Sequence, residues 1–257
     1  MRIALFAADA VGLRVARFLG QQSEGPVCVV VDRLDSKNLN RDILAATGVD
    51  ESRVLRADRS ASSLAGELAA YEPDLCLLAW WPYLLDEPAI QVPQIGCLNF
   101  HPSLLPHGRG KAPNFWTLVE GTPYGVTIHW VDAGIDSGDV AFQREIPVGW
   151  EDTGETLYRK ALDSIVDLFV DSYPKILQGD VPRIPQSPAR CHYQRELDAA
   201  SQIHLDRSYS GRELLNLLRA RTFAPHPGAW FDDSGARYEV RVELRQVGSS
   251  EGNKDAA

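Results

Sequence analysis

The sequence predicts an α/β protein built on a doubly wound, mostly parallel sheet, with a small α+β appendage near the C-terminus. Apolar, strand-like runs alternate with helical patterns as far as residue 80, and this alternation favours parallel strands covered by helices. After residue 98 the hydrophobic pattern changes to a period of two, which favours strands of another kind. A stretch with three prolines at 180–190 then separates the last part of the chain.

The N-terminal half contains three fully apolar runs that predict buried strands. Each is followed by a segment with apolar residues at helical spacing, and Ser62 or Ser63 is a candidate N-cap for the last of these helices. We expect strands at 2–7, 27–32 and 74–80, and helices at 11–19, 38–46 and 61–71.

The segments 125–131 and 141–148 alternate in polarity on either side of the loop DAGIDSGD. They predict neighbouring strands beside the parallel set. Asp152 and Glu155 have the spacing of a capping box, and the apolar pattern after them predicts a long helix that ends near Gln178-Gly179.

The domain division follows from these patterns. We expect an N-terminal catalytic domain over 1–179, a linker over 180–190, a small subdomain over 191–246 and a flexible tail over 247–257. The subdomain should hold a short amphipathic helix within 209–223 and a hairpin within 229–244, with its turn at Asp233-Ser234-Gly235.

Composition limits the classes of function. The 257 residues are 44% hydrophobic and 24% charged, as in ordinary globular proteins. The formal net charge of -9 disfavours a nucleic-acid partner, because such binding needs an excess of Lys and Arg. The four cysteines are far apart without CxxC spacing, so we expect a reducing cytoplasm and no zinc site. Without a signal peptide or an 18-residue apolar segment, no membrane insertion is expected.

The first strand-helix turn, AADAVG, is the place where a dinucleotide site would lie, but it has only Gly12 and lacks the three spaced glycines that a pyrophosphate requires. Asp32, at the end of the second strand, could serve as a ribose-binding acid. For the AADAVG turn and for Asp32 we favour the end of an ordinary strand over a dinucleotide-binding site.

Asn99 and His101 lie two residues apart at the end of a strand-like run, with Asp136 in the glycine-punctuated loop downstream. Residues i and i+2 of a strand share a face, so both polar side chains should enter one cleft while Phe100 points into the core. Alone, such a pair is more often structural. The adjacent PSLLP turn and the loop His107-Gly108-Arg109-Gly110-Lys111 favour a functional interpretation.

Asp136 shares its loop with Asp132 and Asp139, so a solvated or metal-binding acidic loop is the alternative. The spacing lacks the pattern of a calcium loop, and we expect no metal.

The motif order resembles that of the 10-formyltetrahydrofolate-dependent formyltransferase family. The matching segments are Asn99, His101, Ser103-Leu104-Leu105-Pro106, Arg109-Gly110, Gly125-Val126-Thr127 and Asp136-Ser137-Gly138. The resemblance is strongest over 70–175 and implies a Rossmann-like formyltransferase fold, with 10-formyltetrahydrofolate as cosubstrate.

The resemblance also implies roles. Asn99 would stabilise negative charge on the formyl oxygen, His101 would take the proton of the attacking amine, and Asp136 would orient His101 and relay a proton toward the folate nitrogen. The pterin pocket would be formed by two loops, Tyr83-Leu84-Leu85 and Asp132-Ala133-Gly134. Trp80 and Trp81 are either walls of that pocket or plain core and rim, and for Trp80 we favour the latter.

The identity of the substrate that accepts the formyl group follows less directly from the sequence. The resemblance is greatest to nucleotide-sugar N-formyltransferases, because the C-terminal part is short and acidic for a methionyl-tRNA enzyme and AADAVG differs from the phosphate loop of glycinamide ribonucleotide enzymes. Ser103, Arg109, Lys111, Trp116 and Phe223 are then expected to contact a nucleotide-linked amino-dideoxy sugar, and a homodimer is implied. A formyltetrahydrofolate hydrolase and a catalytically silent nucleotide- or folate-binding regulator remain as alternatives.

Overall fold

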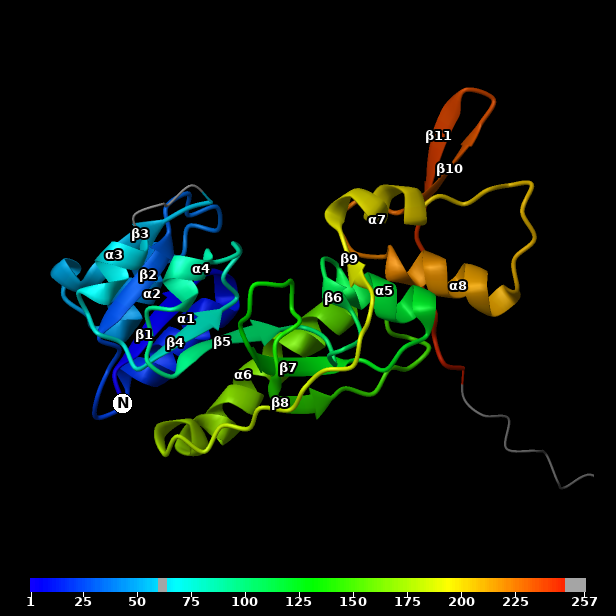
Figure 1. The fold of residues 1–257 in the computed structure, drawn as a ribbon. Helices are drawn as coiled ribbons and strands as arrows, with labels where there is room; N and C mark the ends of the chain where they lie inside the picture. Colours follow the sequence, from blue (N-terminus) through cyan, green and yellow to red (C-terminus); the bar gives the residue numbers. More distant parts are fainter. Residues whose placement is uncertain (60–63, 248–257) are drawn as a thin grey trace, which may run out of the picture.

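A seven-stranded sheet forms the centre of the molecule in the computed structural model, which describes residues 1–59 and 64–247. The strand order is β3-β2-β1-β4-β5-β7-β8, and the first five of these strands are parallel. Helices cover both faces (Figure 1). The predicted α/β class and the mostly parallel sheet are confirmed. The candidate caps Ser62 and Ser63 and all but residue 247 of the predicted tail lie outside the described residues.

The N-terminal half follows the predicted alternation, with one strand that sequence reasoning missed. The missed strand, β3, has only four residues and an exposed Arg56 in its middle, so it shows no continuous apolar run. The elements are β1 Ile3–Ala7, α1 Asp9–Gly20, β2 Cys28–Asp32, α2 Asn40–Thr47, the 3₁₀ turn Glu51–Arg53, β3 Val54–Ala57, α3 Leu64–Ala69, β4 Leu75–Ala79, α4 Glu87–Ile90 and β5 Gly96–His101.

In the second half, β7 pairs antiparallel with both β5 and β8, so the two alternating segments do lie side by side at the edge of the parallel set, as predicted. The elements are β6 Arg109–Gly110, α5 Pro113–Glu120, β7 Gly125–Trp130, β8 Val140–Glu145, α6 Gly154–Leu177, β9 Cys191–His192, α7 Gln194–Ala200, α8 Gly211–Ala220, β10 Ala229–Asp233 and β11 Ala236–Val240.

Both faces of the sheet are buried because successive side chains of each strand point to opposite sides. On β1, Leu5 packs in the cluster that also holds buried residues of α1 and α6. Its neighbour Phe6 packs in the second cluster, with residues of α3. This two-sided burial explains why β1, β2 and β4 are apolar almost throughout. Because the strands run parallel, their carboxyl ends lie at one edge of the sheet, and β5 ends there at His101.

The start of α6 differs from the prediction. Thr153, not Asp152, is the N-cap, and its partner in the capping box is Thr156 rather than Glu155. The Asp152 carboxylate instead accepts hydrogen bonds from Gly149 N, Thr156 Oγ1 and Lys160 Nζ. The side chains of the consecutive residues Asp152 and Thr153 compete for the same turn, and spacing alone does not decide between them. The end of the helix, capped by Gln178, is where it was predicted.

The C-terminal part is joined to the sheet through α8, which packs against α5. Arg219 of α8 donates from Nη1 to Gly149 O at 2.6 Å. Beyond it, β10 and β11 form the predicted hairpin, with Ser234 and Gly235 at positive φ in the turn. The hairpin extends away from the rest of the fold (Figure 1). Within residues 1–59 and 64–247, no helix is both long enough and apolar enough to cross a lipid bilayer.

Candidate active site

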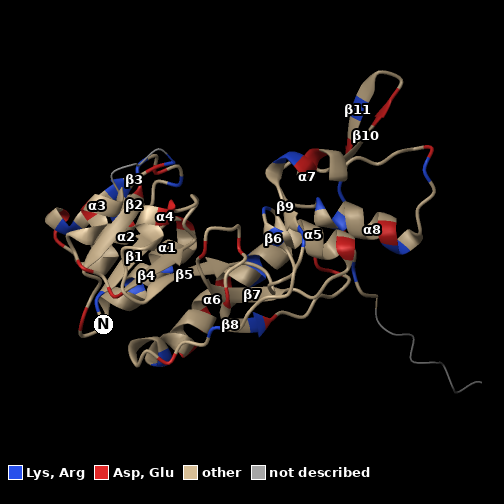
Figure 2. Cartoon of the chain, viewed as in Figure 1, with Lys and Arg blue, Asp and Glu red and all other residues tan. Residues whose placement is uncertain are grey.

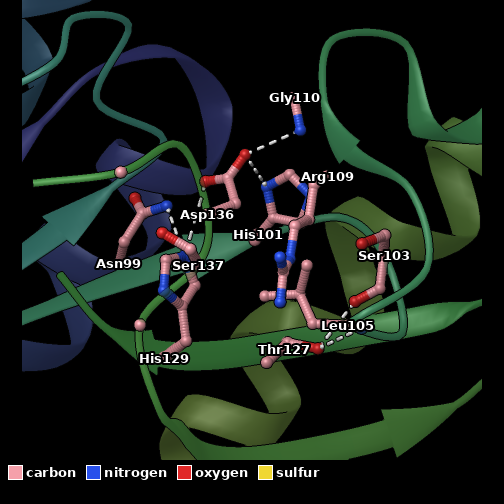
Figure 3. A network of polar contacts seen from close by, with 12 residues as sticks. Asn99, His101, Ser103, Leu105, Arg109, Gly110, Thr127, His129, Asp136 and Ser137 are labelled. Atoms are coloured by element: carbon pink, nitrogen blue, oxygen red, sulfur yellow. Dashed lines mark hydrogen bonds and ion pairs between the residues drawn. The ribbon is translucent and has the colours of Figure 1, made fainter. Parts of the chain in front are cut away.

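The candidate catalytic residues meet where β5 ends beside β7. The antiparallel register places Asn99 opposite His129 and His101 opposite Thr127. The loop between β7 and β8 then carries Asp136 back over these two strands (Figure 3). Three segments that are separate in the sequence thus supply the side chains of one site.

Asn99 and His101 share one face of β5, as their spacing requires. Phe100, between them, points to the other side, where its ring packs against Phe169 of α6 at a centroid distance of 5.1 Å. The imidazole of His101 is buried and Asn99 is half-buried. The packing of Phe100 therefore fixes the direction of both polar neighbours.

The Asp136 carboxylate lies between two imidazoles. Its Oδ2 is 3.5 Å from His101 Nδ1, and its Oδ1 is 3.5 Å from His129 Nε2. Oδ2 also accepts a hydrogen bond from Gly110 N at 2.9 Å (Figure 3). Asp136 adopts a left-handed backbone conformation, with φ of 50°. That conformation costs a non-glycine residue on the order of 1 kcal/mol, so surrounding contacts must hold it.

His129 was not singled out by sequence reasoning. Its Nδ1 donates to Trp130 O at 2.8 Å, since a carbonyl can only accept. In the neutral ring, Nε2 is then an acceptor, and it receives the Asn99 Nδ2 hydrogen bond at 3.1 Å. The available signal was a single histidine in the apolar strand GVTIHW, but linking it to Asn99 required the strand register.

The tautomer of His101 follows from the same kind of argument. Nε2 donates to Gly108 O at 3.0 Å, which leaves Nδ1 of the neutral ring with a lone pair directed toward Asp136. A proton that arrives on Nδ1 would therefore be stabilised at once by the carboxylate. This arrangement suits a general base.

Burial lowers the pKa of His101, and the nearby groups His129 and Lys111 lower it further, whereas Asp136 and the Gly108 carbonyl act in the opposite direction. His101 is therefore neutral at neutral pH. Burial by itself would raise the pKa of Asp136, but the two imidazoles and the Gly110 N–H outweigh it and hold that pKa well below its usual range. The pair thus combines a neutral base with a fixed negative charge.

Comparison with known proteins assigns this arrangement to a family. The family model of formyl transferases matches residues 15–172. The chain belongs to the formyl transferase family. A second model, the N-formyltransferase dimerization C-terminal domain, matches residues 196–246. Among curated relatives, a methionyl-tRNA formyltransferase from Marinobacter nauticus is 32% identical over 190 residues, which are 74% of this chain and 59% of that enzyme. This chain thus spans about half to three fifths of the length of such relatives.

Two solved structures resemble the whole fold. A 4-N formyltransferase from Francisella tularensis superimposes with a TM-score of 0.82 at 22% identity, covering 96% of this chain and 98% of that one. A sugar N-formyltransferase from Shewanella sp. FDAARGOS_354 gives a TM-score of 0.75 at 20% identity, with coverage of 96% and 99%. At these identities the likeness establishes a shared fold.

In this chain the SLLP loop is held by hydrogen bonds to its own residues and to β7. Ser103 is buried, and its Oγ donates to His107 O at 2.7 Å; its expected contact with a substrate stays a prediction. Thr127 Oγ1 donates to Ser103 O and accepts from Leu105 N, which fastens the turn to β7. A motif serine in a tight turn is satisfied by its own loop because the nearest acceptor is a neighbouring carbonyl.

The two cations of the following loop differ in environment. Arg109 is buried, and both its Nε and Nη2 donate to Gln186 Oε1, at 3.1 and 2.8 Å. It holds the linker segment rather than facing solvent, which does not fit the expected contact with a substrate. Lys111 is exposed and close enough to His101 to influence its pKa, so it remains a candidate for meeting an anionic substrate.

The two aromatic residues expected to contact the acceptor also differ. Trp116 is buried in α5, and its ring stacks on that of His192 at a centroid distance of 3.9 Å; its expected contact with a sugar or base stays a prediction. The apolar period of α5 turns this ring into the core. Phe223 is half-buried and contacts Tyr158 at 5.3 Å, and Tyr158 contacts Trp80 at 6.1 Å. These three rings form an aromatic row.

Both loops expected to hold the pterin are partly open. Tyr83 donates from its hydroxyl to Asp32 Oδ1 at 2.8 Å, Leu85 is half-buried and Leu84 is 73% exposed. In the second loop, Asp132, Ala133 and Gly134 are exposed, with Gly134 N donating to Asp132 Oδ1. Their role in binding folate stays a prediction.

Trp81 is buried and contacts Phe6, while Trp80 is half-buried at the end of β4. Trp81 is therefore core, and Trp80 occupies the rim position that the sequence favoured.

The remaining candidate sites have structural explanations. Asp32 is buried and accepts hydrogen bonds from Leu34 N and the Tyr83 hydroxyl, as an ordinary strand terminus does. A Cβ on Gly12 would lie 2.9 Å from the backbone of Ala7, so this glycine allows α1 to approach β1. Among the described residues, no group of three or more His, Cys, Asp or Glu side chains is arranged to hold a metal ion.

Proposed function

We propose that the chain is an N-formyltransferase that moves the formyl group of 10-formyltetrahydrofolate to the primary amine of a nucleotide-linked amino-dideoxy sugar. The observation that carries the formyl transfer is the placement of Asp136 between His101 and His129, beside Asn99, at the end of β5. A hydrogen-bond donor, a neutral base and a fixed negative charge are the groups that attack of an amine on a formyl carbon requires.

In the proposed mechanism the amine attacks the formyl carbon and negative charge develops on the formyl oxygen. The Asn99 amide carries two N–H groups, of which one donates to His129, so the other is free to stabilise this oxyanion. A well-placed side-chain donor of this kind is worth roughly 3 kcal/mol of transition-state stabilisation. His129 holds the amide in place for that role.

His101 then accepts the amine proton on Nδ1, the nitrogen that faces Asp136. The carboxylate stabilises the imidazolium that results. The tetrahedral intermediate then collapses: the C–N bond to folate breaks, and the proton held on His101 passes by way of Asp136 to the leaving folate nitrogen, which restores the neutral base.

The aromatic row supports an acceptor with a ring system. The β4–β5 register pairs Leu78 with Asn99, and Trp80 follows directly after the end of β4. From Trp80 the row runs through Tyr158 to Phe223 in the C-terminal part. Flat rings such as a nucleotide base bind well on aromatic surfaces, and the exposed Lys111 would meet the phosphates.

A nucleic-acid acceptor has less support. The net charge is -9. In α7, α8 and the C-terminal hairpin, Lys and Arg residues are interspersed with Asp and Glu residues (Figure 2). Binding to a phosphate backbone instead favours a surface on which basic residues cluster.

The experiment is an end-point assay by mass spectrometry with 10-formyltetrahydrofolate and a panel of acceptors. We expect one formyl group to be added to a thymidine-, uridine- or guanosine-linked amino sugar. The panel includes methionyl-tRNA, because the curated relatives act on it by name, and glycinamide ribonucleotide. Formylation of methionyl-tRNA alone would contradict the sugar assignment, and folate turnover without any acceptor would indicate a hydrolase.

We also propose a homodimer. The model matching 196–246 is described as a dimerization domain, and the hairpin within it extends from the body of the protein (Figure 1). Sedimentation equilibrium should give twice the chain mass of 28.4 kDa. A monomer at micromolar concentration would contradict the proposal.

A further inference from the structure

One side chain from the linker reaches the two segments that position Asp136. Gln186 Nε2 donates to Asp136 O at 3.1 Å and to Gly138 O at 2.6 Å. Its Oε1 accepts both hydrogen bonds from Arg109. Residues 182–185 and 187–190 are exposed, whereas Gln186 is half-buried. The linker thus inserts one amide into the protein, and every hydrogen-bonding group of that amide is used.

The two donated bonds fix the turn that carries Asp136. They hold the carbonyls of Asp136 and Gly138, the first and last residues of the segment Asp136-Ser137-Gly138. Asp136 needs such support because its backbone is in the left-handed region, which favours glycine. Without the two hydrogen bonds from Gln186, we expect the turn to relax toward a more favourable backbone conformation.

The two hydrogen bonds that Gln186 accepts from Arg109 hold the segment Arg109-Gly110. Arg109 precedes Gly110, whose N–H donates to Asp136 Oδ2. The position of Gly110 is defined closely, because a Cβ there would lie 2.1 Å from His192 O of the neighbouring strand β9. Gln186 therefore acts on both the backbone of Asp136 and the donor that orients its carboxylate.

We propose that Gln186 is a positioning residue, which holds the Asp136 carboxylate against the imidazoles of His101 and His129. The inference rests on the proposed function in so far as Asp136 takes part in formyl transfer. Its physical basis is distance: the carboxylate is 3.5 Å from each ring, and a displacement of about 1 Å in a catalytic group can cost on the order of 100-fold in rate.

The sharpest variant is Gln186→Glu. It keeps the side-chain length and an acceptor for Arg109, so the linker stays anchored, but it has no N–H to donate to the two carbonyls. Gln186→Ala removes all four hydrogen bonds. Arg183→Ala is the matched control, because Arg183 belongs to the same linker but donates to Ile95 O and stacks on Trp130.

The readout is the titration of His101, followed by NMR on histidine-labelled protein and assigned with His101→Gln. Asp136 and the Gly108 carbonyl raise the pKa of His101, while burial, His129 and Lys111 lower it. A displaced carboxylate therefore moves the His101 midpoint to lower pH. We expect this shift in Gln186→Ala, which adds no charge, and an unchanged midpoint in Arg183→Ala.

With an active acceptor, kcat of both Gln186 variants should fall roughly 10- to 100-fold, while KM for 10-formyltetrahydrofolate stays within about twofold. In Gln186→Ala the pH at which kcat reaches half its maximum should also move down, which a simple loss of folded protein would not produce. An unchanged His101 midpoint in folded Gln186→Ala would overturn the proposal.

The titration needs no acceptor, so it separates this inference from the proposed function. If Asp136→Asn keeps wild-type turnover, the catalytic assignment fails, whereas the effect of Gln186 on the His101 midpoint is still decided by the titration alone.

Discussion

We expect His101→Ala to lower kcat by roughly 100-fold or more while the affinity for 10-formyltetrahydrofolate stays near that of the wild type. The loss follows from removal of the general base, which typically contributes a factor of about 10²–10⁴. Folate affinity is preserved because the loops expected to hold the pterin are separate from His101 in the chain. Steady-state rates and calorimetric titration with folate measure the two quantities.

His107→Ala is the matched control, since His107 is exposed in the same loop and contributes its backbone, not its ring, to the contact with Ser103. Its kcat should be close to that of the wild type. The cavity left in His101→Ala offers a second readout, because added imidazole should restore part of the activity. A rate near that of the wild type in His101→Ala would refute the assignment of the base.

The second large effect is expected from Asp136→Asn, which should also lower kcat by roughly 100-fold or more. The amide keeps the shape of the side chain and an acceptor for Gly110 N, but it carries no charge to stabilise the imidazolium of His101. Because the carboxylate raises the pKa of His101, its loss lets His101 stay neutral to lower pH. The acid limb of the kcat profile should therefore move down in pH as the plateau falls.

Asp139→Asn removes the same charge from the same loop and serves as the control. Asp139 contacts β7 through its backbone carbonyl, which accepts a hydrogen bond from Trp130 N. Its pH profile should match that of the wild type. If Asp136→Asn instead moved the acid limb upward, or left kcat unchanged, the proposed interaction between Asp136 and His101 would be wrong.

The local hydrophobic pattern of the sequence was enough to predict most of the strands and helices of the sheet domain. The apolar runs that became β1, β2 and β4 are buried on both faces of the sheet, so their sequences carry the signal without gaps. The strand β3 was missed because it is short and exposes Arg56 at the sheet's edge. The cap of α6 was misplaced by one residue because Asp152 and Thr153 are both competent caps.

Some residues of the candidate active site could be predicted from local sequence, and others could not. Asn99 and His101 could be paired from sequence because two residues on one strand share a face by geometry alone. His129 could not be joined to them, since its contact depends on the register of two antiparallel strands. Gln186 lay in a proline-rich stretch that predicts only an irregular linker, and nothing local indicates that its amide turns inward.

The amino-acid sequence by itself determined the alternation of strands and helices, the shared face of Asn99 and His101, and the family motif that includes Asp136. These depend on period, spacing and residue type, which the chain carries locally. Only the tertiary structure decided that His129 completes the site, that Trp116 and Ser103 are buried, and that Gln186 supports Asp136. Such contacts depend on how distant segments pack, because burial and hydrogen-bond partners are set by neighbours in space.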